Sequence, residues 1–396
     1  MARFEISDSE KADLVAFLFA LTDESALPEI PTSVPSGLPV VPRLENPARA
    51  IVRQVNRSEK AEQAEGRRDP QVFTVRAGQS IQSVIDRARA GDTVQIPYGN
   101  YSESIILDEP GIRLIGLPNA QGAYPVLEGA GRLTDGVIAS GDGFEMAFLE
   151  LKGYTNIGIL VKNARDAYLH DLSLAGPGTL WLSVELCSDA HVERVRVTGM
   201  RSAGVYVGSS DGISVTGVEA YGNAIGLELE NSIHSEVYAS HTYENGVGIF
   251  VALQPHLPSK VSLYNKVYDN IIENNNIEST MPQEPLGGTG ILVLAVDHVE
   301  VAGNTLRVHE SAGLAVFSLT GDFAGNEMDV GIYPEYLSAY ENRYDENKAD
   351  ILWDGTGVGN AFDDKTAVSD PAVLPSSRWA DPIYRLYLRI IMLFAR

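Results

Sequence analysis

Short alternations of apolar and polar residues, separated by Gly, Asn or Asp, dominate the chain from about residue 73 onward. Runs such as Gly204-Val205-Tyr206-Val207 alternate with a period of two, which predicts β-strands that bury one face. A Gly-apolar-x-apolar tetrad and its near matches recur in register at Ile159, Leu182, Val205, Leu227, Ile249, Ile291 and Leu314. Successive members are 23, 23, 22, 22, 42 and 23 residues apart, which indicates a structural repeat with one longer interval.

This repeat predicts an all-β fold, a right-handed parallel β-helix. Three short strands per coil allow each coil to pair with the next at about 4.8 Å and to bury its inward side chains in a continuous stack. The chain from Thr93 to about Phe362 has room for about 11 to 12 such coils. The density of Gly and β-branched residues disfavours a helical repeat of similar length.

The rest of the chain predicts flanking segments. Residues 1–27 form an amphipathic helix with a capping box, and residues 28–72 form a Pro-rich and then charged linker. The β-helix is expected at 73–375, with a capping helix at 80–90 over its first coil. Residues 376–396 are predicted to form a C-terminal capping helix; a helix lying on a membrane surface is the alternative.

Composition restricts the partners. With 30 Lys plus Arg against 53 Asp plus Glu, the net charge of -23 argues against nucleic acid and anionic membranes, and it disfavours polyanionic polysaccharides unless cations bridge them. A single cysteine, Cys187, forms no internal disulfide and no thiolate zinc site. The sequence has no apolar run of about 18 residues, as a membrane span needs, and no export signal as written.

Two stretches carry a family resemblance. Residues 75–85 and 90–101 resemble the opening of pectin-lyase-like right-handed β-helix proteins, and residues 265–275 and 288–293 are similar to a bacterial family of parallel β-helix repeat proteins without an assigned role. The resemblance covers about three quarters of the chain and implies a periplasmic or extracellular location. It specifies the fold more than the chemistry, because this fold hosts lyases, hydrolases, epimerases, esterases and adhesins.

A second resemblance concerns the N-terminus. Residues 6–22 resemble the last helix of a c-type cytochrome domain. The haem-attachment cysteines are absent, so no cofactor is expected in this chain. The resemblance therefore implies either a remnant of such a domain or a docking helix, with a c-type-cytochrome-like protein as partner.

The repeat register predicts two clusters on the outside of the β-helix. Tyr206, Glu228 and Phe250 follow one another in the tetrad strand, where two aromatic rings that flank a carboxylate suit sugar rings in a groove. Aromatic rings that only shield neighbouring backbone are the alternative.

The second cluster comprises Arg196, Glu219 and His241, which are 23 and 22 residues apart. An acid, a base and a cation in consecutive coils could abstract a proton next to a uronate carboxylate. The alternative is a surface ion-pair ladder, which a solvated sheet favours because opposite charges on adjacent strands need no catalytic role.

Two loops are expected to project from the coils, at 253–260 and 279–288, where the longer interval lies. They make His256 and Glu284 further candidates for substrate binding. The recurring Asn223, Asn245, Asn304 and Asn326 are expected in one turn, as inward amide ladders. No spacing of histidines brings three together, so no metal site is predicted.

Two functions follow from these patterns. The first is a carbohydrate-polymer-binding β-helix protein, with a polysaccharide or oligosaccharide as partner, that acts as a lyase or an epimerase in an external groove. The second is a non-catalytic scaffold that docks a cytochrome-like partner. The residues alone leave open whether the protein is an enzyme.

Overall fold

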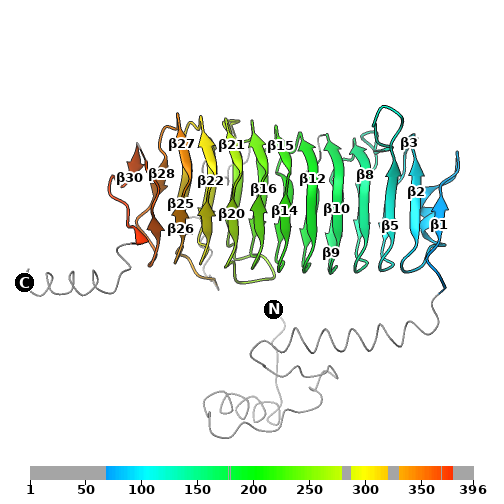
Figure 1. The fold of residues 1–396 in the computed structure, drawn as a ribbon, viewed down its shortest axis with the longest axis horizontal. Coiled ribbons are helices and arrows are strands. Elements are labelled where there is room, and N and C mark those ends of the chain that lie inside the picture. Colours follow the sequence, from blue (N-terminus) through cyan, green and yellow to red (C-terminus); the bar gives the residue numbers. More distant parts are fainter. Residues whose placement is uncertain are drawn as a thin grey trace, which may run out of the picture. The chain divides into compact units, whose positions relative to one another are not determined.

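The computed structural model describes residues 68–176, 178, 180–278, 287–319, 330–366 and 368–377. The chain divides into two units, Met1–Asp69 and Pro70–Arg396, and the described fold belongs to the second. Within the described residues, parallel strands stack coil upon coil in two long sheets (Figure 1). This arrangement confirms the predicted all-β solenoid.

Eleven described strands form sheet B. In order along the stack, they are β4 (Ile105–Leu107), β7 (Asp135–Ala139), β9 (Ile157–Lys162), β11 (Leu180–Glu185), β13 (Ala203–Gly208), β16 (Ile225–Glu230), β19 (Val247–Ala252), β22 (Thr289–Leu294), β25 (Ala312–Phe317), β28 (Ile351–Trp353) and β30 (Ser369–Asp370).

The other nineteen described strands form sheet A, which bends within each coil. They are β1 (Val72–Thr74), β2 (Thr93–Pro97), β3 (Asn100–Tyr101), β5 (Arg113–Leu117), β6 (Val126–Glu128), β8 (Glu145–Lys152), β10 (Tyr168–Ala175), β12 (His191–Thr198), β14 (Ser214–Thr216), β15 (Glu219–Tyr221), β17 (Glu236–Tyr238), β18 (His241–Tyr243), β20 (Lys266–Tyr268), β21 (Ile271–Glu273), β23 (Glu300–Ala302), β24 (Thr305–Arg307), β26 (Ser338–Tyr340), β27 (Arg343–Asp345) and β29 (Ala361–Phe362).

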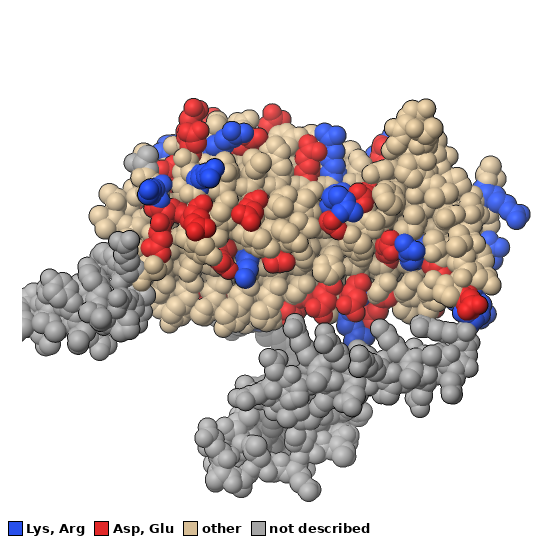
Figure 2. All heavy atoms as spheres, viewed as in Figure 1, with Lys and Arg blue, Asp and Glu red and all other residues tan. Residues whose placement is uncertain are grey.

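The predicted tetrad register is confirmed residue for residue. Sheet B pairs the seven tetrad residues in sequence order: Ile159, Leu182, Val205, Leu227, Ile249, Ile291 and Leu314. The longer interval after Ile249 therefore adds loop residues to one coil and leaves the stacking unbroken. On the outside, acidic and basic side chains are interspersed over the face shown in Figure 2.

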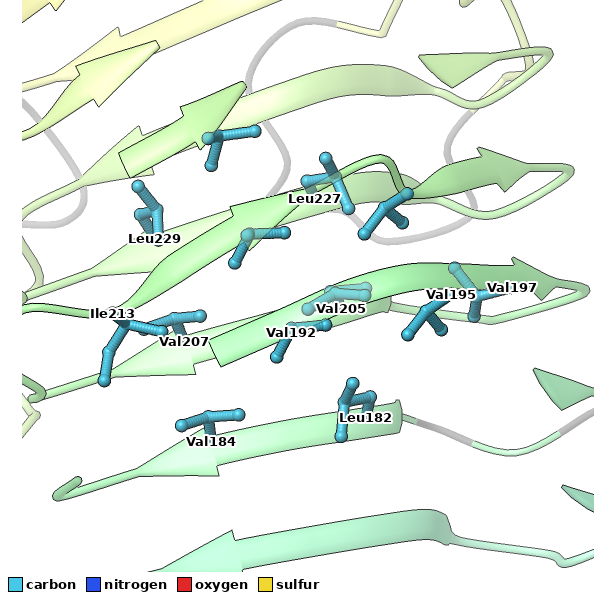
Figure 3. Close-up of a cluster of buried hydrophobic side chains, with 14 of the residues drawn as sticks. Leu182, Val184, Val192, Val195, Val197, Val205, Val207, Ile213, Leu227 and Leu229 are labelled. Atoms are coloured by element: carbon cyan, nitrogen blue, oxygen red, sulfur yellow. The ribbon is translucent and has the colours of Figure 1, made fainter. Parts of the chain in front are cut away.

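Aliphatic side chains from both sheets fill the interior in ladders (Figure 3). Leu182, Val205 and Leu227 stack from sheet B, facing Val195 and Val197 of β12. The tetrad glycine has a packing cause, because the chain of the next coil lies directly over it. A Cβ at Gly226 would lie only 2.5 Å from the carbonyl oxygen of Gly248, so a side chain does not fit.

Two buried amide ladders run along the stack. Asn223 Nδ2 donates to Asn245 Oδ1 over 3.0 Å, and Asn245 continues to Asn275 over 2.8 Å. The prediction that Asn304 belongs to this turn is wrong. Asn304 lies in a second ladder at the bend of sheet A, where it accepts from Asn270 over 2.9 Å. Asn223 and Asn245 precede their tetrad residues by four positions, whereas Asn304 precedes Leu314 by ten, so it occupies another part of the coil.

The first coil carries a helix that is shorter than predicted. Helix α3 spans Ile81–Ile85 and buries Ile81, Val84 and Ile85. The carboxylate of Glu103 accepts from the backbone nitrogen of Ile81 over 2.8 Å and so fixes its start. Tighter turns follow at once, with Ala88 donating to the Ile85 carbonyl, and they end the helix before the predicted residue 90. The predicted helix at 1–27, residues 378–396 of the C-terminal helix predicted at 376–396, Asn326 and most of the linker lie outside the described residues.

Candidate functional site

Two adjacent rows of side chains on the outer face of sheet B form the candidate site. In the first row the register places Ser183, Tyr206, Glu228 and Phe250 in four successive coils. The second row lies two residues further along the same strands and on the same face, because side chains alternate along a strand. Its members are Lys162, Glu185, Gly208, Glu230 and Ala252.

Tyr206 links the two rows. Its hydroxyl donates to Oε2 of Glu230 over 3.1 Å. The ring occupies this space because Gly208 has no side chain: a Cβ at Gly208 would lie 2.4 Å from the Tyr206 hydroxyl. A glycine in the second row thus lets a tyrosine in the first row reach the carboxyl group of the next coil.

The two glutamates of the second row have different partners. Glu185 Oε2 lies 3.1 Å from Lys162 Nζ, and Glu185 Oε1 accepts from Ser183 over 2.9 Å. Glu230 instead hydrogen-bonds Tyr206 and the side chains of Glu228 and Gln254. Glu185 is therefore a carboxylate in an ion pair with a lysine, whereas Glu230 lies next to a second carboxyl group, that of Glu228. We call Glu228 and Glu230 the carboxyl pair.

Burial sets the protonation of that pair. Glu228 and Glu230 are only 7% and 8% exposed to solvent. Burial raises the pKa of Glu230, and the hydrogen bonds to Tyr206 and Glu228 and the charge of nearby His256 offset this effect in part. Two carboxyl groups can hydrogen-bond each other only when one carries a proton. Two carboxyl groups at such close range disfavour the state in which both are ionised.

The tyrosine stays protonated as well. Burial raises the pKa of Tyr206, and the carboxyl groups of Glu230 and Glu228 raise it further. Tyr206 is therefore a neutral hydrogen-bond donor across the physiological pH range.

A cleft of about 510 Å³ opens beside the second row. It lies at the turn after the strands of sheet B, where Asn163, Leu186 and Ser209 directly follow the second-row residues Lys162, Glu185 and Gly208. Ser259, from the loop after β19, also lines the cleft.

The structure describes two of the three remaining residues that were predicted to bind substrate. His256 lies on the loop after β19, is exposed, and is near enough to influence the charge of Glu230. Glu284 lies outside the described residues. Phe250 occupies the predicted position beside Glu228, but it is 6% exposed and so is buried on an outward-facing row. Their roles in substrate binding stay predictions.

The predicted triplet lies on sheet A, where the register pairs Arg196 with Glu219 and Glu219 with His241. Arg196 Nε lies 3.3 Å from Glu219 Oε2, and the Tyr243 hydroxyl donates to Glu219 Oε1 over 2.7 Å. The carboxylate partner of His241 is Glu273, whose Oε1 lies 2.8 Å from the Nε2 of His241. The side chains of Arg196, Glu219 and His241 are 56%, 39% and 38% exposed. This geometry favours the ion-pair ladder, and a catalytic role for the triplet stays a prediction.

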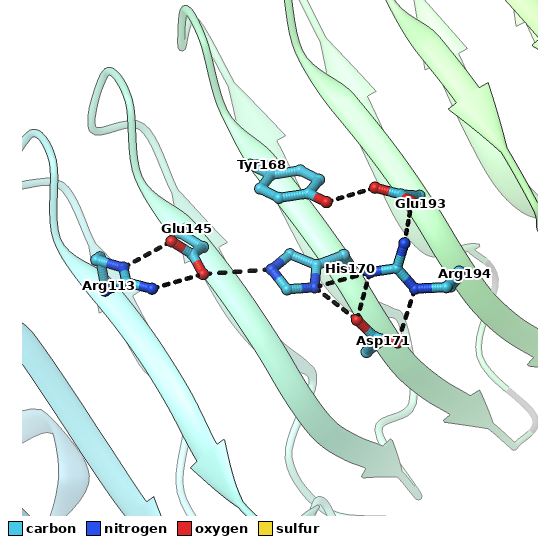
Figure 4. Close-up of polar contacts among 7 residues, drawn as sticks. All are labelled: Arg113, Glu145, Tyr168, His170, Asp171, Glu193 and Arg194. Atoms are coloured by element: carbon cyan, nitrogen blue, oxygen red, sulfur yellow. Dashed lines mark hydrogen bonds and ion pairs between the residues drawn. The ribbon is translucent and has the colours of Figure 1, made fainter.

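A denser polar cluster lies elsewhere on sheet A (Figure 4). We call it the sheet A network; its members are Arg113, Glu145, Tyr168, His170, Asp171, Glu193 and Arg194. His170 is 8% exposed and lies between two carboxylates, 3.3 Å from Glu145 and 2.7 Å from Asp171.

Each of these carboxylates also binds an arginine. Arg113 reaches Glu145 over 2.6 and 3.1 Å, and Arg194 reaches Asp171 over 2.9 and 2.7 Å. These hydrogen bonds lower the pKa of Glu145 and of Asp171. The network is therefore a set of paired, ionised carboxylates.

Sequence reasoning missed Glu230, Glu185 and Lys162. The alternation that places Glu228 outward also places Glu230 outward, two residues on, so counting along one strand would have found it. The pairing of Glu185 with Lys162 follows from the 23-residue repeat. The raised pKa of Glu230 could not be predicted from the sequence, because it depends on burial.

In the part of the chain that the structure describes, no group of three or more His, Cys, Asp or Glu residues is placed to hold a metal ion. Over the same residues, no helix has the length and apolarity needed to cross a membrane.

Comparison with known proteins supports the fold. A family model described as the right handed beta helix region matches residues 157–328. No curated protein shows a significant match to the sequence.

Solved structures with this fold cover most of the chain. An alginate lyase from Paenibacillus sp. FPU-7 has a TM-score of 0.52 and 16% identity, and covers 74% of this chain and 99% of its own. The A-module of the mannuronan C-5 epimerase AlgE6 from Azotobacter vinelandii has a TM-score of 0.54 and 16% identity, covering 73% and 92%. DFA-IIIase from Arthrobacter chlorophenolicus A6, without its lid, has a TM-score of 0.52 and 13% identity, covering 78% and 97%. At these identities the likeness shows a right-handed parallel β-helix.

Proposed function

We propose that this protein binds a carbohydrate polymer along the outer face of sheet B and acts on it by acid–base chemistry. The carboxyl pair of Glu228 and Glu230 provides the proton donor in this proposal. The observation that carries the proposal is the buried carboxyl pair, in which burial raises the pKa of Glu230. A carboxyl group whose pKa is raised above the ordinary value is suited to general acid catalysis.

The surroundings of the pair suit a sugar. Tyr206 and Phe250 flank Glu228 in the adjacent coils. Phe250 is buried, whereas the half-buried ring of Tyr206 next to a carboxyl group can contact and orient a pyranose. The cleft at the turn after the second row is lined by Ser188, Ser209 and Ser210, whose polar groups suit a hydroxyl-rich ligand. The similar solved structures include an alginate lyase and a mannuronan epimerase, which supports a polymer of sugars as the substrate class.

The finer assignment is a lyase or an epimerase. In such a reaction one carboxyl group of the pair, in its ionised form, would take the proton from the sugar carbon, and the other carboxyl group or Tyr206 would supply a proton. Lys162 is the nearest cation of the second row, but it is paired with Glu185 over 3.1 Å. The net charge of -23 disfavours a polyuronate without bridging cations, so neutral glycans belong in the same test.

Two other predictions remain proposals. The triplet of Arg196, Glu219 and His241 is the alternative catalytic cluster, on the outer face of sheet A. The cytochrome-docking alternative concerns residues 1–27, which lie outside the described residues, and the comparisons do not favour it. A periplasmic or extracellular location also stays a proposal, based on the family resemblance.

The test is a turnover assay on alginate, pectin, neutral glucans and fructans, each with and without Ca²⁺. New double bonds, reducing ends and inversion at C5 are followed by absorbance and proton NMR. We expect turnover on one class, and a loss of about 10²- to 10⁴-fold in Glu230→Gln, because this substitution removes the acid.

The matched control is Glu219→Gln, the same change of carboxyl to amide on sheet A. We expect it to keep wild-type turnover. Activity that survives Glu230→Gln and disappears in Glu219→Gln would place the site at the triplet and overturn the proposal. Turnover on none of the four classes would remove its catalytic half.

A further inference from the structure

One buried side chain closes the loop beside the carboxyl pair. Asn231 directly follows Glu230 at the end of β16 and is 1% exposed. Its Nδ2 donates to the carbonyl oxygens of Gln254 and Ser259 over 2.7 and 2.6 Å, and its Oδ1 accepts from the Gln254 backbone nitrogen over 2.7 Å. A single amide thus joins both ends of the segment 254–259.

This segment, which we call the clamped loop, carries groups that act on Glu230. The Gln254 side chain hydrogen-bonds Glu230, and His256 influences its charge. The backbone nitrogen of Ser259 donates to Ser209 Oγ over 3.2 Å, which ties the loop to the preceding coil. The loop therefore crosses the end of the second row.

We infer that Asn231 is a positioning residue, whose side chain holds the clamped loop against Glu230 and keeps water from that carboxyl group. The inference rests on the proposed function, because it concerns the acid used there. It adds a residue that touches neither the sugar nor the transferred proton and acts only through the loop.

Every element around Glu230 contributes to its protonation. Tyr206 faces it from β13, Glu228 from its own strand, and Gln254 and His256 from the clamped loop. Burial is the largest influence on the pKa of Glu230, and it raises that pKa. Release of the loop would admit water, which favours the ionised form, so the pKa should fall towards that of an exposed glutamate.

The test uses the full chain with Asn231→Gly. Asn231 has a φ of 47°, a left-handed conformation that glycine adopts without strain, so the change removes the clamp and spares the backbone. Hydrogen exchange of residues 253–260 should accelerate by about tenfold or more, since three hydrogen bonds are lost. Carbon NMR of ¹³C-labelled glutamate, with the Glu230 signal assigned from Glu230→Gln, should show a lower pKa for Glu230.

The matched control is Asn274→Gly, an exposed asparagine with a φ of 50° at another turn. It should change neither readout. If Asn231→Gly fails to fold, Ser209→Gly removes only the bond to Ser259, also from a left-handed residue with a φ of 51°, and should shift both readouts in the same directions by less.

Two results would overturn the inference. One is unchanged exchange of the loop in the folded variants, which would show that the amide does not hold it. The other is a released loop with an unmoved Glu230 titration, which would show that the loop does not shield the acid. Neither readout uses a glycan, so absence of turnover on every substrate would refute the proposed function and leave this test intact.

Discussion

The carboxyl groups of the sheet A network and the carboxyl pair of sheet B lie in opposite electrostatic environments. In the sheet A network, Glu145 and Asp171 each hold an arginine in a two-bond contact, and their pKa values are lowered. In the carboxyl pair of sheet B, Glu230 is buried beside Glu228 and a tyrosine, and its pKa is raised. Both groups lie on the outer face of the same solenoid.

This difference separates stabilising acids from candidate catalytic acids. A carboxylate paired with arginine is held ionised and contributes to the fold, but it has no proton to transfer at neutral pH. A buried acid next to a second carboxyl group has a raised pKa, which disfavours folding at high pH but suits proton transfer. Whether an acidic residue is a candidate for catalysis therefore depends on whether a cation lies beside it, and not on how many acidic residues the surface carries.

The largest expected effect on stability comes from Asp171→Asn. Asp171 accepts from both Arg194 and His170, so the amide would weaken the contact with Arg194 and the contact with the buried imidazole of His170. We expect a loss of about 1–3 kcal/mol in the free energy of unfolding, measured in urea. Asparagine tolerates the φ of 52° at this position, so the backbone is not the cause.

Glu230→Gln is the matched substitution on sheet B. The amide resembles the protonated acid, so at neutral pH the free energy of unfolding should change by less than in Asp171→Asn. A larger loss in Glu230→Gln would contradict the distinction between the two regions.

The two variants should also differ in the sign of their pH dependence. Asp171 has a lowered pKa, so its stabilisation is present above its unfolded pKa of about 3.9 and is lost as the pH falls through the folded value. Glu230 has a raised pKa, so its stabilisation is present below an unfolded pKa of about 4.3 and is lost as the pH rises through the folded value.

Urea unfolding between about pH 3.5 and pH 8 measures this sign. Relative to wild type, Asp171→Asn should lose more stability as the pH rises, whereas Glu230→Gln should gain stability. Parallel curves for the two variants would show that the two carboxyl groups share one electrostatic environment.

The smallest effect is expected at the exposed ladder. Arg196 is 56% exposed and its contact with Glu219 is 3.3 Å long, so solvent screens the pair. Arg196→Ala should change the free energy of unfolding by less than about 1 kcal/mol, and a double-mutant cycle with Glu219→Gln should give a coupling energy of similar size. A coupling that persists in 1 M salt would show a pair that is more buried and more specific than a ladder.

The fold was predictable from the sequence, because coil stacking converts a repeat distance into a spatial contact. The spacing of Leu182, Val205 and Leu227 was enough to pair their strands. Asn304 was assigned to the wrong ladder because a coil has several turns that accept asparagine, and residue type alone does not distinguish them. The candidate site was predicted in part: Tyr206 and Glu228 follow from the register, whereas Glu230 was overlooked.

By itself, the alternation of apolar residues and the 22- or 23-residue spacing determined which side chains point inward and which strands are neighbours. These properties depend only on the period of a strand and on the length of a coil. Only the tertiary structure decided which outward acid has an arginine and which is buried without one. The pKa of an acid depends on the distances between side chains and on the exclusion of water, and neither can be obtained from the order of the residues alone.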